Sequence, residues 1–275
     1  MALYISDPDW QRLNIKAAEV DRLIFYGTAV SSFLEISVSH YTASLREIFA
    51  GEPEVVEWLN SVWEPEERAH GDAMRAYIER VWPQYQWDKA YAGFIGQYAP
   101  FCTADHLRPT PAREMLARCV TECEAAVLYR TLSNLARDPL AKHLFLQMYE
   151  DEISHYKFFF RWFRILRERE GLSTLTVFSD TVTRQQKAKQ EDIGTALSHV
   201  NVGFADTMAS VPAMPFMTLE AQSLSIMAKV AIEDHFPFET ARAMMLKPLR
   251  ACSGAGKPLA NAVDMFYRLG QRALV

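Results

Sequence analysis

Apolar positions recur every three or four residues over most of this chain, which is the spacing of amphipathic helices. Glycine is scarce, with 11 in 275 residues, and the good helix formers Ala, Leu, Glu and Arg dominate the periodic segments. The pattern predicts an all-α protein. The predicted long helical runs are residues 9–50 with a break near 14–18, residues 53–81, residues 111 to about 138, and residues 139 to about 170.

Prolines and glycines mark the ends of these runs. Gly51 ends the first, and Pro53 suits the first turn of the second. A kink or restart is expected at Pro65, and Gly171 ends the fourth run. Residues 84–108 are aromatic and turn-rich, which predicts a connection with some short helix.

The last hundred residues have a different character. Residues 172–192 begin with hydroxyl side chains and continue as a charged stretch that is predicted to be helical. Residues 217–274 are expected to form three more helices, separated around residues 236–237 and 253–258. We therefore predict a single domain, with a bundle core over about 9–170 and a C-terminal helical extension over about 172–275.

Two Glu-x-x-His pairs, Glu67/His70 and Glu152/His155, stand in the second and fourth helical runs. Residues i and i+3 project from one face of a helix, so each pair can hold one metal ion. Each pair follows a glutamate set in an apolar run, because Glu35 lies 32 residues before Glu67 and Glu124 lies 28 before Glu152. Two such hairpins make a four-helix bundle that binds two metal ions between its helices.

Chance is a poor explanation of this pattern. A chain of this composition would carry about 0.5 Glu-x-x-His matches at random, whereas here two occur, both on predicted helices. Carboxylates on apolar or small-residue helix faces are costly unless a metal ion or hydrogen bonds compensate their charge. In the third helix, Glu122 and Glu124 compete as the ligand. The stripe of Val120, Val127, Leu128 and Thr131 favours Glu124.

Composition narrows the function classes. The net charge is −5 and no long Lys/Arg run occurs, which argues against nucleic-acid binding. No apolar stretch reaches the roughly 18 residues of a membrane span, and the N-terminus lacks a signal-peptide layout. The four cysteines have no disulfide-framework spacing, so we expect reduced thiols and a cytoplasmic protein. Mixed carboxylate and imidazole ligands favour iron or manganese over structural zinc.

The segments around these pairs resemble a known family. Residues 63–72 (WEPEERAHGD) are similar to the W-x-x-E-E-x-x-H-G-D stretch of the soluble acyl-carrier-protein desaturases, and residues 151–155 (DEISH) are similar to their D-E-x-x-H. These enzymes belong to the ferritin-like di-iron carboxylate superfamily. The resemblance covers about residues 20–165. It departs where desaturases carry a threonine one turn after the third-helix glutamate, since Val127 and Leu128 stand here.

The resemblance implies a ferritin-like bundle that binds two iron ions, or manganese in one or both positions. It implies reduction of O2 with electrons from a ferredoxin or reductase, and oxidation of an apolar substrate. The implied ligands are Glu35, Glu67, His70, Glu124, Glu152 and His155. We expect a desaturase-like or monooxygenase-like di-iron oxidase or oxygenase that desaturates, hydroxylates or N-oxygenates a small or acyl-type substrate. We expect a homodimer. The alternative is a non-catalytic iron-binding or ferroxidase protein of the same superfamily.

Overall fold

The computed structural model describes residues 8–204 and 235–272, and these residues form an all-helical structure without a strand. The all-α prediction is confirmed. None of the described helices is long and apolar enough to cross a membrane. The main helices are α2 (Arg22–Ile36), α3 (Val38–Ile48), α4 (Pro53–Trp58), α5 (Glu64–Val81), α6 (Trp87–Tyr98), α7 (Pro111–Leu135), α8 (Pro139–Glu170), α9 (Thr174–Lys187), α10 (Gly194–Val200), α12 (Phe238–Arg250) and α13 (Gly256–Arg272). Short elements are α1 (Ile15–Ala18), the 3-10 turns Trp10–Arg12, Ala99–Cys102, Ala104–His106 and Asn201–Phe204, and the π-helical turns Leu59–Trp63 and Ala188–Ile193.

The chain divides into two compact units. The first unit contains Met1–Leu107, Tyr129–Met148 and Lys189–Phe236, and the second contains Arg108–Leu128, Tyr149–Ala188 and Pro237–Val275. Each unit therefore draws on separated parts of the sequence. Helices α7 and α8 each contribute residues to both units. The single domain expected from the sequence stays a prediction.

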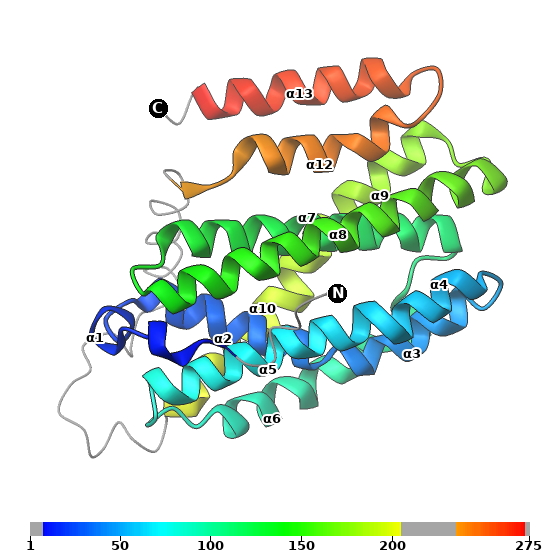
Figure 1. Cartoon of the computed structure of the whole chain (residues 1–275). Coiled ribbons are helices and arrows are strands. Elements are labelled where there is room, and N and C mark those ends of the chain that lie inside the picture. The colour runs from blue at the N-terminus through cyan, green and yellow to red at the C-terminus, as the bar shows by residue number, and fades with distance from the viewer. Residues whose placement is uncertain (1–7, 205–234, 273–275) are drawn as a thin grey trace. The chain divides into compact units, whose positions relative to one another are not determined.

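In the first unit, α2 and α5 lie alongside each other (Figure 1). Gly71 is the point of closest approach. A Cβ atom added there would lie 2.5 Å from Ile36 Cγ1, 2.8 Å from the Ile36 backbone nitrogen and 3.1 Å from Glu35 Cβ. The helix is interrupted at Ser37, directly after this contact, where the Ser37 hydroxyl donates to the Leu34 carbonyl. Glycine is required because a larger residue would meet backbone atoms as well as a side chain.

Helix α5 is entered through a π-helical turn. Helix α4, the turn Leu59–Trp63 and α5 follow one another without a break from Pro53 to Val81. Pro65 lies in the first turn of α5 and has no N–H to donate. The wider turn directly before it corresponds to the kink or restart expected at this proline. Trp63 at its end is buried, and Glu67 and His70 follow one and two turns later.

Asp138 fastens three parts of the first unit to one another. Its carboxylate accepts hydrogen bonds from the Asn14 backbone N–H at 2.6 Å, the Tyr77 hydroxyl at 3.0 Å and the Ala141 backbone N–H at 2.9 Å. The last bond caps the N-terminus of α8. Burial, together with the charge of Asp138, raises the pKa of Tyr77, so this phenol stays protonated and donates.

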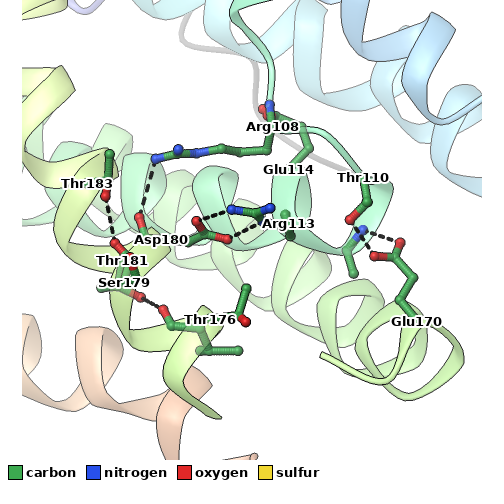
Figure 2. Close-up of polar contacts among 12 residues, drawn as sticks. Arg108, Thr110, Arg113, Glu114, Glu170, Thr176, Ser179, Asp180, Thr181 and Thr183 are labelled. Carbon is green, nitrogen blue, oxygen red and sulfur yellow. Dashed lines mark hydrogen bonds and ion pairs between the residues drawn. The ribbon is translucent and has the colours of Figure 1, made fainter. Parts of the chain in front are cut away.

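The second unit is fastened around the start of α7 (Figure 2). The Glu170 carboxylate, at the end of α8, accepts hydrogen bonds from the Thr110 hydroxyl and from the Ala112 backbone N–H. Arg113 binds the buried carboxylate of Asp180 through two nitrogens at 2.6 and 2.7 Å, which joins α7 to α9. The two hydrogen bonds from the Arg113 guanidinium compensate the buried charge of Asp180.

Helix α12 is held on α7 and α8 of the second unit. The Tyr156 hydroxyl donates to the Met244 carbonyl at 2.7 Å, and Cys123 Sγ lies 3.8 Å from the Ala241 carbonyl. Helix α13 returns beside α12 as a helical hairpin (Figure 1).

Most element ends agree with the sequence patterns. Pro53, Pro111 and Pro139 begin helices, and Gly171 follows α8 with a φ of 65°. Residues 84–108, expected to be a connection with some short helix, contain the twelve-residue helix α6. Trp87, Ala90, Phe94 and Tyr98 recur at three- and four-residue spacing and are all buried. Of the C-terminal helices, α12 and α13 are described, and the part of the prediction that falls on residues 217–234 lies outside the described residues.

We predict that Gly71→Ala destabilises the protein by about 1–3 kcal/mol, because the new methyl group forces α2 and α5 apart. Urea denaturation followed by circular dichroism measures this change. Gly96→Ala in α6 is the matched control, since nothing lies within 4 Å of the added carbon. The control should gain about 0.5–1 kcal/mol from helix propensity. Equal effects of the two substitutions would contradict a close approach at Gly71.

We also predict that Asp138→Ala lowers the free energy of unfolding by about 2–4 kcal/mol, because it removes the α8 cap and leaves buried donors without their acceptor. Asp9→Ala serves as the control. Asp9 also accepts a backbone hydrogen bond at a helical turn, but it is exposed, and its loss should cost no more than about 0.5 kcal/mol. A comparable loss of unfolding free energy in both variants would mean that burial of Asp138 does not increase its contribution to stability.

Candidate metal centre

The first unit brings Glu35, Glu67 and His70 together. Glu35 comes from α2, and Glu67 and His70 come from one face of α5. Each residue offers one ligand atom, and these three atoms lie within 4.8 Å of one another. All three side chains are buried, with exposed fractions of 7%, 4% and 1%. We call this group the first half-site.

The second unit contains a group of the same composition. Glu122 comes from α7, and Glu152 and His155 come from one face of α8. Their ligand atoms also lie within 4.8 Å of one another, and all three side chains are buried. His155 Nδ1 lies 3.3 Å from Glu152 Oε2 and 3.6 Å from Glu122 Oε2. We call this group the second half-site.

The third-helix ligand is where the structure departs from the sequence-based preference. Glu122, rather than Glu124, lies with Glu152 and His155. Glu122 belongs to a stripe with Met115, Cys119 and Ala126, every member of which is buried. Glu124 is only half-buried. The stripe that favoured Glu124 includes Leu128, which is also only half-buried, so apolar character alone did not mark the inner face of α7.

Tyr129 is a site residue that the sequence patterns did not single out. Its hydroxyl donates a hydrogen bond to Glu35 Oε1, within the first unit. The Tyr129 ring is buried, packs edge-on against the His70 ring at 6.3 Å and stacks parallel to Phe145 at 6.3 Å. Tyr129 follows Glu122 by seven residues, so the two share a face of α7. Glu124 lies on a different face of α7.

Each half-site concentrates carboxylates out of water. Two glutamates whose oxygens lie within 4.8 Å of each other repel strongly in a region of low dielectric constant. Such a pair is stable only when a cation, a proton or hydrogen bonds offset the charge. Carboxylate oxygens with one imidazole nitrogen form the donor set that iron and manganese accept. The residues present therefore fit a metal ion in each half-site.

Thiols do not take part in these groups. Cys119 and Cys123 precede and follow Glu122 on α7, and both are buried and free. Burial, and then the neighbouring charge of Glu122, raises the pKa of Cys119, while burial, and then Glu124, raises the pKa of Cys123. Both thiols therefore stay protonated at neutral pH. They pack as small apolar side chains and not as metal-binding thiolates.

Comparison with protein-family models, curated proteins and solved structures gives no match. The function is therefore inferred from the two half-sites and the residues around them.

The small polar face beside Glu35 is covered by α6. The Trp87 indole N–H donates to the Ser32 hydroxyl at 2.9 Å, and Ser32 itself donates to the Ala29 carbonyl. The Thr28 hydroxyl donates to the Ile24 carbonyl. Ser32 and Thr28 thus use their polar atoms in packing within the first unit. Residues 84–108 matter here because they supply the helix that closes this side of α2.

We predict that Glu122→Gln lowers the amount of Fe²⁺ bound under anaerobic conditions from about two ions per chain to about one, because the second half-site loses one of its two carboxylates. Glu124→Gln is the matched control. It removes the same charge one position beyond Cys123 and should leave the metal content unchanged. Elemental analysis after desalting measures both. Loss of metal from Glu124→Gln alone would restore Glu124 as the ligand.

Proposed function

We propose that this protein is a non-haem di-iron oxidase or oxygenase with a ferritin-like four-helix bundle, in which each half-site holds one iron ion. One observation carries the proposal. A buried set of two glutamates and one histidine occurs twice, each time with a Glu-x-x-His pair on one helix and a single glutamate on another. This repetition is the pattern of di-iron carboxylate proteins built on helical bundles.

The roles of the residues follow from their chemistry. Glu35, Glu67 and His70 would hold one ion, and Glu122, Glu152 and His155 the other. Two iron ions, when bound, would supply the electrons that reduce O2. The four carboxylates would neutralise the charge of two divalent ions, so the loaded protein need not bury net charge. Buried aromatic side chains such as Phe145 and Phe159 would keep water away from the reacting atoms.

The residues one turn after Glu122 bear on the class of reaction. With Glu122 as the ligand, the positions one turn later are Ala125 and Ala126, so this face again lacks the threonine hydroxyl found in the desaturases that residues 63–72 resemble. The protein would therefore handle protons differently from those enzymes. Oxidation of a small or acyl-type substrate, with electrons from a ferredoxin or reductase, is the proposal. The proposal also includes assembly as a homodimer and the binding of manganese in place of iron. Separate measurements test each of these.

The test is anaerobic loading with Fe²⁺, followed by elemental analysis and by O2 uptake at an oxygen electrode. We expect about two iron ions per chain and rapid O2 consumption. Glu67→Gln and His155→Ala should each abolish most of both, because each removes a ligand from a buried set. Glu66→Gln is the matched control for Glu67→Gln and should behave as the unchanged protein. Binding of much less than one ion per chain would overturn the proposal.

The same experiment separates the rival function. An iron-storing protein would keep consuming O2 as more Fe²⁺ is added and would retain many ferric ions per chain. Native mass spectrometry would then find a large assembly. An oxidase or oxygenase should stop at about two ions and need an added reductant and substrate for further turnover.

A further inference from the structure

The hydrogen bond from Tyr129 to Glu35 links the first half-site to α7. Tyr129 lies in the part of α7 that belongs to the first unit, and Glu35 lies in α2. The Tyr129 hydroxyl donates to Oε1 of Glu35, and both side chains are buried. A phenol has one proton to donate, and here it is committed to a carboxylate that also belongs to the candidate metal group.

The ring of Tyr129 has little freedom to turn away. It stacks on Phe145 with an interplanar angle of 11° and meets His70 edge-on at 77°. Phe145 and His70 are themselves buried. A phenol held between two buried rings fixes the direction from which its O–H approaches the carboxylate. The carboxylate is in turn fixed, because an oxygen that accepts this bond cannot rotate freely.

We propose that Tyr129 is a positioning residue that holds Glu35 in one orientation, so that Oε2 is presented to the metal ion while Oε1 stays on the phenol. This inference rests on the proposed function. Tyr129 thereby sets the metal affinity of the first half-site. Hydrogen-bonded partners of this kind contribute about 10–100-fold to metal affinity in characterised sites.

The second half-site is arranged differently. Its single-helix carboxylate, Glu122, lies 3.6 Å from His155 Nδ1, a nitrogen of the same ligand group. Glu35 instead accepts a bond from a residue outside its ligand group. The two half-sites have the same ligands but unlike support. They should bind metal ions with unequal affinity, and Tyr129 accounts for part of the difference.

The experiment measures Co²⁺ binding by equilibrium dialysis and visible absorption, with Tyr129→Phe placed in two backgrounds. Glu122→Gln weakens the second half-site and leaves the first to be measured. Glu35→Gln weakens the first and leaves the second. In the Glu122→Gln background, Tyr129→Phe should weaken Co²⁺ binding about 10–100-fold and change the cobalt absorption bands. In the Glu35→Gln background it should change the affinity less than about twofold, because the carboxylate that Tyr129 positions has already been replaced.

Tyr26→Phe is the control for loss of a buried tyrosine hydroxyl. Tyr26 lies in α2, is buried, and donates to Asn201 Oδ1 at 2.7 Å, away from the ligand groups. It should leave Co²⁺ binding unchanged in both backgrounds, and circular dichroism checks that all variants are folded. Equal weakening by Tyr129→Phe in both backgrounds would show a general structural effect and overturn the inference. Unchanged Co²⁺ binding in both backgrounds would also overturn the inference.

Failure of the proposed function gives a different result. If the unchanged protein binds no Co²⁺ or Fe²⁺, there is no metal centre, and the role of Tyr129 falls with it. If the unchanged protein binds two ions and Tyr129→Phe in the Glu122→Gln background binds as tightly as Glu122→Gln alone, only the positioning role is wrong.

Discussion

Burial of carboxylates is the constraint on which the rest of this structure depends. Glu35, Glu67, Glu122 and Glu152 are almost completely removed from water, in two groups whose oxygens lie close enough to repel one another. Folding cannot recover that cost from apolar contacts around each glutamate, because the penalty arises from the charge itself. A bound cation would offset this electrostatic cost directly. The helices must then hold the ligands in place whether or not the ion is present, which is a demand on backbone geometry.

The backbone meets this demand at specific points. A helix that supplies a Glu-x-x-His pair places both ligands on one face, but the third ligand comes from another helix, so the separation of the two helices sets the geometry of the group. In the first unit, Gly71 follows His70 directly and lets α5 approach Glu35 and Ile36. In the second, Glu170 and Asp180 hold the start of α7, two or more turns before Glu122. Contacts outside the half-sites thus hold the helices that carry the ligands.

The sequence predicted what depends on local periodicity and missed what depends on distant contacts. Proline and glycine located the ends of α7 and α8, and the i, i+3 spacing identified Glu67/His70 and Glu152/His155. The sequence favoured Glu124 over Glu122 because α7 is buried on several faces, so apolar neighbours do not distinguish the inner one. The extent of helix α6 was underestimated because Gly93 and Gly96 resemble turn residues, although Gly96 is exposed and Gly93 packs near His199. The bond from Tyr129 to Glu35 joins residues 94 positions apart and leaves no local signal.

Two half-sites with the same ligands need not have the same chemistry. The symmetry lies in the ligand residues, which the repeated helical hairpins supply. It does not extend to their partners, since Glu35 accepts a bond from a phenol whereas Glu122 lies near its own group's imidazole. Unequal hydrogen-bonded support can give two sets of identical ligands unequal affinities for a metal ion. The repetition of the ligand residues therefore does not require the two half-sites to have equal affinity for a metal ion.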